Sequence, residues 1–191
     1  MNICLYGASS NELDYKYIEQ VKLLGTLMAK RKHRLVFGGG AQGLMGAAVE
    51  GISQSGGHST GIAPTFFDKP GILFKECSEF IFTETMRERK QLMEDRSDAF
   101  IMVPGGIGTL EEFFEILTLK QLGQHNKPIA VYNVNNYYDD LSRMLDRMVE
   151  ENFMKAECQH IYAVFDNPDR LLDYIEKEAN CPLDVSHLKN I

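Results

Sequence analysis

Short apolar segments alternate with helix-length amphipathic segments along almost the whole of this 191-residue chain, and this alternation most restricts the folds open to it. Strands are expected at residues 2–7, 34–40, 58–63, 79–84, 98–103, 128–133 and 161–165. Helices are expected at residues 14–31, 43–56 and 85–97, from the glycine turn after 104 to about 122, at 138–151 and after 168. The pattern predicts an α/β fold, a doubly wound, mostly parallel sheet of about seven strands with helices on both faces.

Length and composition fit a single globular domain. With 191 residues, of which 44% are hydrophobic, the chain can bury a substantial core. No internal repeat, low-complexity tract or linker interrupts the strand and helix pattern. We therefore expect residues 1–178 to form one domain and residues 179–191 to form a peripheral C-terminal tail.

Charge and cysteine usage argue against several functional classes. The balance of 20 Lys and Arg against 27 Asp and Glu gives a net charge of −7, which disfavours broad binding to nucleic acid or anionic membranes. No apolar run approaches the ~20 residues needed to span a bilayer, and no secretory signal is visible. The four cysteines are scattered, so a zinc site or a disulfide framework has little support. We expect a cytoplasmic protein that binds neither nucleic acid nor membrane.

Three glycine- or serine-rich turns follow predicted strands, at residues 7–10, 38–40 and 105–109. Parallel strands bring their carboxyl ends to one edge of a sheet, so the three turns can form one composite ligand site. Backbone N–H groups of a glycine turn that opens a helix can surround a phosphate. A single glycine cluster is more commonly just a tight turn, but two clusters on one edge favour a site. Ser9 is either a phosphate ligand or a helix cap.

The acids that follow the third turn allow two interpretations. If Thr109 is the N-cap of a helix, then Glu112 occupies N3 and the two form a capping box, with Glu111 favouring the helix dipole. Spacing alone favours this structural role. The alternative places Glu112 at the mouth of a phosphate-lined cleft, as a carboxylate that faces a sugar ring.

The charged segment 85–97 is equally ambiguous. Charge runs on short helices are usually solvated faces with i,i+4 ion pairs. However, Arg89 and Lys90 share a helical face with Met86 and Met93, which suggests that they point at an anion near a partly buried edge. The five histidines have no metal-ligand spacing, so no metal site is expected.

Taken together, the segments "YGASS", "FGGGAQGLMG", "MRERK" and "PGGIGTLEE" resemble the LOG ("Lonely Guy") family of nucleoside 5′-monophosphate phosphoribohydrolases. The similarity runs over about residues 2–175 in the right order and spacing. Relatives in this family have often been labelled lysine decarboxylases. The resemblance implies a Rossmann-like fold in a homodimer, and hydrolysis of AMP or cytokinin riboside monophosphates to free base and ribose 5-phosphate. It implies no metal or redox cofactor.

The resemblance also implies roles for individual residues. Arg89 and Glu112 match the catalytic pair of the family. The expected substrate site comprises Ser9, Gly39, Gly40, Lys90, Gly105, Gly106, Ile107, Gly108, Thr109, Leu110, Glu111 and Thr118. Glu112 would stabilise the oxocarbenium-like sugar or orient the attacking water, and Arg89 would hold the phosphate or ribose or set the charge state of Glu112.

Two departures and one rival interpretation remain. Arg87 stands where the family often has histidine, and Thr65-Phe66-Phe67 follows Pro64 where plant relatives carry an acid that contacts the substrate. Arg87 adds positive charge near the site, and the departure after Pro64 concerns the preferred base more than the catalytic step. The rival is a non-catalytic nucleotide or molybdenum-cofactor carrier, which uses a related PGGxGT turn. The complete pair of Arg89 and Glu112 favours the enzyme.

Overall fold

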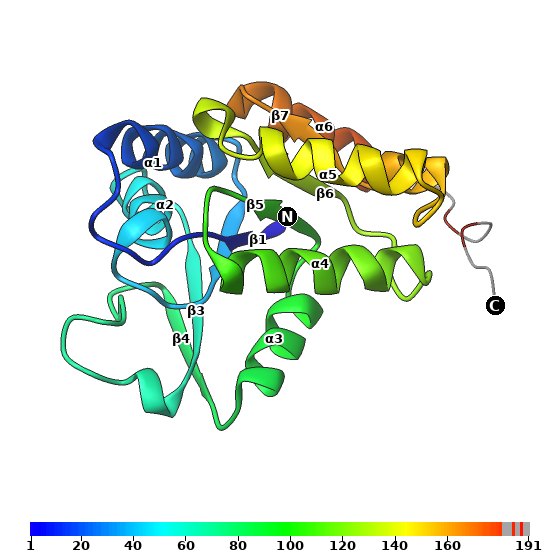
Figure 1. The fold of residues 1–191 in the computed structure, drawn as a ribbon. Helices are drawn as coiled ribbons and strands as arrows, with labels where there is room; N and C mark the ends of the chain where they lie inside the picture. The colour runs from blue at the N-terminus through cyan, green and yellow to red at the C-terminus, as the bar shows by residue number, and fades with distance from the viewer. Residues whose placement is uncertain (181–184, 186–187, 189–191) are drawn as a thin grey trace.

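The computed structural model describes residues 1–180, 185 and 188, in which seven strands pair into one sheet (Figure 1). The strands are β1 (Asn2–Tyr6), β2 (Arg34–Phe37), β3 (Ser59–Pro64), β4 (Glu79–Thr83), β5 (Ala99–Met102), β6 (Ile129–Tyr132) and β7 (Ala163–Phe165). Every pairing between these strands is parallel. The predicted doubly wound α/β fold is confirmed, and the described sheet is parallel throughout rather than mostly parallel.

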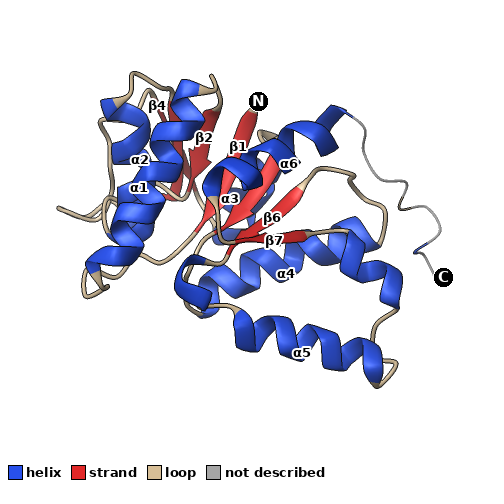
Figure 2. Cartoon of the chain, turned by 90° about the horizontal axis from the view of Figure 1, so that it is seen from above, coloured by secondary structure: helices blue, strands red, loops and turns tan. Residues whose placement is uncertain are grey.

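Six α-helices of the described chain cover the two faces of the sheet (Figure 2). They are α1 (Tyr15–Lys30), α2 (Gly43–Gln54), α3 (Met86–Asp95), α4 (Ile107–Gln121), α5 (Asp139–Glu150) and α6 (Pro168–Asn180). Helices α1, α2 and α6 cover one cluster of buried apolar side chains, and α3, α4 and α5 cover a second. Strand β1 supplies both clusters, because Ile3 and Leu5 face one side and Cys4 and Tyr6 face the other.

The order of strands across the sheet is β4-β3-β2-β1-β5-β6-β7. The chain therefore builds outward from β1 in one direction as far as β4, then crosses back to place β5 on the other side of β1. The register pairs Leu5 with Phe37 and Tyr6 with Met102, so the turns after β2, β1 and β5 emerge next to one another. A reversal of strand order of this kind is where open α/β sheets bind ligands.

Most of the predicted C-terminal tail, residues 179–191, lies outside the described residues. Ala179 and Asn180 complete α6. Val185 and Leu188 are buried in the apolar cluster on the α4 and α5 side of the sheet. None of the described helices combines the length and the apolar sequence needed to cross a membrane.

Candidate active site

Hydrogen bonds join the glycine-rich turns at the carboxyl edge of the sheet. The N–H of Ala8, after β1, donates to the carbonyl of Pro104, after β5, at 3.1 Å. The N–H of Leu44, in the first turn of α2, donates to the carbonyl of Ala8 at 2.8 Å. Gly43 has φ +60°, and a Cβ there would lie 2.5 Å from the Ala8 carbonyl oxygen, so this approach requires glycine. The predicted meeting of these turns at one edge is confirmed.

Helix α4 begins at Ile107, with Gly106 as its N-cap and no side chain capping its first turn. The predicted capping box is therefore wrong, because Thr109 and Glu112 both lie inside the helix and are buried. The glycines let the strand turn directly into the helix: a Cβ on Gly105 would lie 2.1 Å from Thr109 Oγ1. The uncapped N–H groups and the positive end of the helix dipole favour an anion at this turn.

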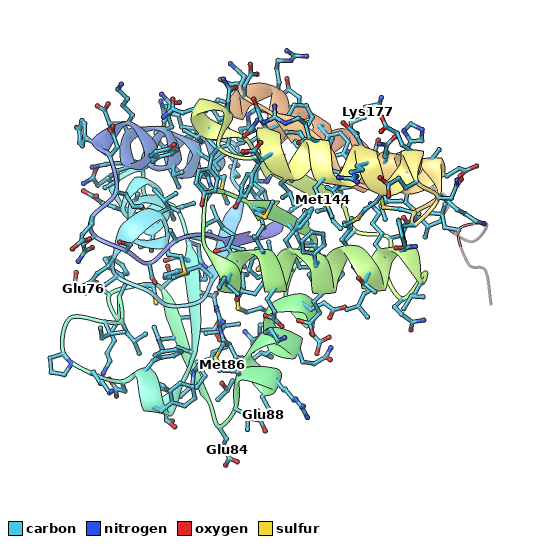
Figure 3. All side chains as sticks on the ribbon, viewed as in Figure 1. Glu76, Glu84, Met86, Glu88, Met144 and Lys177 are labelled. Atoms are coloured by element: carbon cyan, nitrogen blue, oxygen red, sulfur yellow. The ribbon has the colours of Figure 1, made fainter. Side chains whose placement is uncertain are left out.

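The chain does contain a capping box, at the start of α3. The hydroxyl of Thr85 accepts a hydrogen bond from the N–H of Glu88 at 3.1 Å, and the Glu88 carboxylate accepts one from the N–H of Thr85 at 3.3 Å. Figure 3 shows Met86 and Glu88 in this first turn, just beyond Glu84 at the tip of the preceding loop. The cap fixes where α3 begins, and so determines which side of the helix Arg89 occupies.

Arg89 and Glu112 form a buried ion pair between α3 and α4. The distance from Arg89 Nη1 to Glu112 Oε1 is 2.8 Å, and each side chain is 10% exposed. Gly38, directly after β2, makes room for the guanidinium, since a Cβ there would lie 2.2 Å from Arg89 Nη2. Within the described chain, Arg89 Nε is buried and has no hydrogen-bond partner. A ligand that reaches this side of the guanidinium can accept a hydrogen bond from it.

The charge state of Glu112 depends on its neighbours. Burial raises the pKa of its carboxyl, Arg89 and Lys90 lower this pKa, and Glu111 raises it. From β1, two further groups face the same carboxyl: burial raises the pKa of Cys4 to about 12 and that of Tyr6 well above its usual range. A buried carboxyl tuned by one adjacent arginine is typical of a group with a chemical role.

Lys90 makes a second ionic link between the same two helices. Its Nζ contacts Glu111 and lies 2.8 Å from Glu115 Oε2. The two carboxylates are 53% and 42% exposed, so this link lies on the solvent side of the buried pair. Lys90 and Glu111 were both expected to line the nucleotide site, and the structure pairs them with each other beside it.

The other expected site residues fall into two groups. Ser9 is exposed in the turn after β1, and Ile107 and Gly108 are exposed at the start of α4. Gly39 and Gly40 are buried in the turn after β2, and Leu110 is half-buried in the first turn of α4. Thr118 is exposed and lies eleven residues beyond Ile107, about 16 Å farther along the helix axis. The structure therefore brings the turn residues together at one edge and leaves Thr118 away from them.

The segment 68–76, which has no recognisable motif, lies over the turn after β2. The N–H of Phe74 donates to the carbonyl of Gly39 at 2.8 Å, and the N–H of Ala41 donates to the carbonyl of Ile72 at 2.9 Å. A hollow of about 520 Å³ lies between this segment and Ala41. No element is expected from the sequence between the predicted strands at residues 58–63 and 79–84, because these contacts are made by backbone groups that leave no pattern in side-chain types.

Tyr137, like the segment 68–76, contacts the turns of the site and was not predicted from the sequence. It follows β6, and its hydroxyl donates to the carbonyl of Gly105 at 2.8 Å. The adjacent Tyr138 donates in the same way to the carbonyl of Val103 at 2.9 Å. The only sequence signal is a pair of tyrosines after an asparagine-rich turn, which does not indicate a contact with residues more than 30 positions earlier.

Candidate metal ligands are dispersed. Among residues 1–180, 185 and 188, no group of three or more His, Cys, Asp or Glu side chains is arranged to hold a metal ion. Cys4, Cys77 and Cys158 are free thiols, and Cys181 lies outside the described residues.

Comparison with solved structures identifies relatives in fold. The molybdenum cofactor carrier protein of Chlamydomonas reinhardtii superposes with a TM-score of 0.70 at 19% identity, covering 92% of this chain and 96% of that one. The molybdenum cofactor binding protein of Rippkaea orientalis gives a TM-score of 0.68, also at 19% identity, covering 92% and 94%. At this level of identity the likeness concerns the fold alone.

Comparison of sequences is more specific. Two cytokinin riboside 5′-monophosphate phosphoribohydrolases of Arabidopsis thaliana are 37% and 35% identical over 175 residues each. The alignments cover 91% and 92% of this chain and 76% and 82% of those proteins. The family model described as "Possible lysine decarboxylase" matches residues 45–175. The chain therefore belongs to the LOG family of phosphoribohydrolases, which are glycosidic hydrolases and to which that description is also applied.

Proposed function

We propose that this protein hydrolyses the N-glycosidic bond of a nucleoside 5′-monophosphate, either AMP or a cytokinin riboside monophosphate. The observation that carries the proposal is the buried pair of Arg89 and Glu112 next to the uncapped start of α4. At ~1.5 Å of rise per residue, Glu112 lies about 9 Å from Gly106 along the helix, a span that the phosphate and ribose of one nucleotide can bridge.

The phosphate end of the substrate binds at the start of α4. Residues 106–108 are exposed, and a Cβ on Gly106 or Gly108 would meet no atom within 4 Å, so the turn is open to solvent. The N–H groups of this first turn have no side-chain cap and converge at the positive end of the helix. A 5′-phosphate accepts hydrogen bonds from them without needing a lysine or a metal ion.

The sugar end of the substrate faces Glu112. Cleavage of the C1′–N bond leaves positive charge on the ribose ring, and a carboxylate held nearby stabilises it. Water then adds its hydroxyl to C1′ and its remaining proton goes to the leaving base. Arg89 opposes the effect of burial on the Glu112 pKa, and so favours the charged form that this step requires.

A carrier function is the competing proposal. The structural neighbours that share this fold include proteins named as molybdenum cofactor carriers. A carrier needs the anion-binding turn, but it does not need a buried carboxylate held against an arginine. Burying two charges is costly unless they are well paired, so the Arg89–Glu112 pair favours catalysis over storage.

The deciding experiment is an assay of base release. Purified protein is incubated with AMP and with isopentenyladenosine monophosphate, and free base and ribose 5-phosphate are followed by chromatography. We expect both products in equal amounts from at least one substrate, and release about a thousandfold slower from the Glu112→Gln variant, which should still bind the nucleotide. Binding without release by the wild-type protein would instead support the carrier. If the protein neither releases base nor binds the nucleotide, both the enzyme and the carrier proposals are refuted.

We also propose that the protein acts as a homodimer, as the family resemblance implies. Apolar side chains remain exposed on two helices of one face. Ile107 of α4 is 88% exposed. Met144 of α5, labelled in Figure 3, is 51% exposed. Light scattering of the purified protein measures the assembly directly. A monomeric mass at the concentration of the assay would contradict this part of the proposal.

A further inference from the structure

Three successive carbonyl groups directly after β5 each accept a hydrogen bond from another part of the fold. Val103 accepts from the Tyr138 hydroxyl at 2.9 Å, Pro104 from the Ala8 N–H at 3.1 Å, and Gly105 from the Tyr137 hydroxyl at 2.8 Å. Two of these donors come from the segment after β6, which belongs to none of the motifs of the site. The bonds fix the orientation of the peptide groups that lead into α4.

The orientation of these carbonyls decides where the following N–H groups point. In a planar trans peptide, the C=O of one residue and the N–H of the next point in opposite directions. The bond from Tyr137 to the Gly105 carbonyl therefore directs the N–H of Gly106 away from Tyr137. A glycine pair has wide backbone freedom, and without this bond the Gly105 carbonyl could turn toward the ligand and repel an anion.

We propose that Tyr137 is a positioning residue, which orients the Gly105–Gly106 peptide so that its N–H group faces the phosphate of the substrate. The inference deepens the proposed function, because it concerns the phosphate end of the same site. Tyr137 is itself held in place: its ring packs edge-on against Tyr17 and Tyr138, with ring centroids 6.1 Å and 4.8 Å away.

The segment that carries Tyr137 is ordered by its own hydrogen bonds. The Asn133 side chain accepts from the N–H of Tyr138 at 2.6 Å and donates to Asp139 at 2.8 Å. Asn135 and Asn136 have φ values of 54° and 60°, a left-handed conformation that asparagine tolerates better than most residues. The hydroxyl of Tyr137 is therefore presented to the β5–α4 turn from a defined position.

Tyr138 provides a matched control. Its hydroxyl makes the same kind of bond to the carbonyl of Val103, but the next residue is Pro104, which has no N–H to direct. The same hydroxyl also meets the backbone of Gly105. Tyr138→Phe should therefore lower the melting temperature, because it removes a buried hydrogen bond, and should weaken phosphate binding less than Tyr137→Phe does. Tyr137→Phe removes the hydroxyl of a side chain that is 47% exposed, so the fold should tolerate it.

The test compares the two variants in binding and in turnover. For Tyr137→Phe we expect the Kd for ribose 5-phosphate and the KM for the nucleotide to rise about three- to tenfold, the size of one hydrogen bond, with kcat within about twofold. The amide signal of Gly106 in the ¹⁵N–¹H spectrum of the free variant should also move. Adenosine, which lacks the phosphate, should bind equally well to both proteins.

Several results would overturn the inference. One is an unchanged Kd for ribose 5-phosphate in Tyr137→Phe, and another is an equal loss of affinity in Tyr138→Phe. A third is weaker binding by Tyr137→Phe with an unmoved Gly106 amide signal, which would indicate that the hydroxyl contacts the ligand directly. The last is no binding of ribose 5-phosphate by the wild-type protein. Because the Kd is measured without turnover, the comparison decides the role of Tyr137 even if no nucleotide is hydrolysed. In that case the proposed function fails and the positioning role is still decided.

Discussion

Helices α3 and α4 are joined by two ionic links at adjacent positions, and the two links differ sharply in their environment. The side chains of Arg89 and Glu112 are each 10% exposed. In the second link, Lys90 contacts Glu111, which is 53% exposed, and Glu115, which is 42% exposed. Buried charges interact strongly and tolerate the loss of a partner poorly, but exposed pairs are screened by water. A shift of one position along each helix thus separates a pair suited to chemistry from a link that contributes mainly to the surface.

The largest expected difference between the two links is in turnover. Glu112→Gln should lower kcat by about a thousandfold, because the amide cannot stabilise positive charge on the sugar. Glu111→Gln, the matched change at the exposed neighbour, should alter kcat by less than about threefold. Rates of base release and calorimetric binding of AMP measure both variants. Similar losses in the two would mean that burial does not distinguish their roles.

The second-largest expected effect on activity comes from displacing the Arg89 guanidinium. In Gly38→Ala the new Cβ would lie 2.2 Å from Arg89 Nη2, and the flexible arginine can move aside without unfolding the chain. We expect kcat/KM to fall about 10- to 100-fold, since a shift of roughly 1 Å in a catalytic group has such effects.

A double-mutant cycle isolates the cause of that loss. Once Arg89 is replaced by Met, the Gly38→Ala change should cost little further activity, because the group that it displaces is absent. Equal losses from Gly38→Ala in the wild-type and Arg89→Met backgrounds would show that the glycine acts in some other way. Thermal denaturation of each variant checks that the fold is retained.

The pH dependence of kcat/KM should reveal how the exposed link acts on the buried pair. Burial raises the pKa of Glu112, so activity that needs its charged form should fall, as pH decreases, at a higher pH than an ordinary glutamate would give. Glu111 raises this pKa and Lys90 lowers it. Glu111→Gln should therefore move the acidic limb to lower pH, and Lys90→Met should move it to higher pH. Shifts in the same direction would contradict this account.

Sequence reasoning predicted the parallel sheet because strand–helix alternation is a property of side-chain pattern. It also predicted that the glycine-rich turns meet, since the carboxyl ends of parallel strands share an edge. The start of α4 could not be read in the same way. Thr109 and Glu112 have capping-box spacing, but Gly105 and Gly106 allow the helix to begin earlier, at Ile107, and Glu112 turns inward to Arg89.

Contacts made by backbone groups could not be predicted from the sequence. The bond from Tyr137 to the Gly105 carbonyl joins the turns after β6 and β5, and no spacing rule connects them. Likewise, Gly38 resembles any glycine of a tight turn until the guanidinium of Arg89 is placed against it. Both cases concern which groups meet across the sheet edge, which is decided by tertiary packing rather than by local preference.

The smallest expected effect tests the exposed link itself. Lys90→Met should lower the free energy of unfolding by less than about 1 kcal/mol at low ionic strength, and the difference should shrink in high salt, because water and ions already screen the two carboxylates. We expect kcat to change by only a few-fold, through the effect of Lys90 on the charge of Glu112. Chemical denaturation at two salt concentrations, together with base-release rates, measures both quantities. A loss of turnover as large as that of Glu112→Gln would place Lys90 in contact with the substrate, and the distinction between the buried and exposed links would no longer hold.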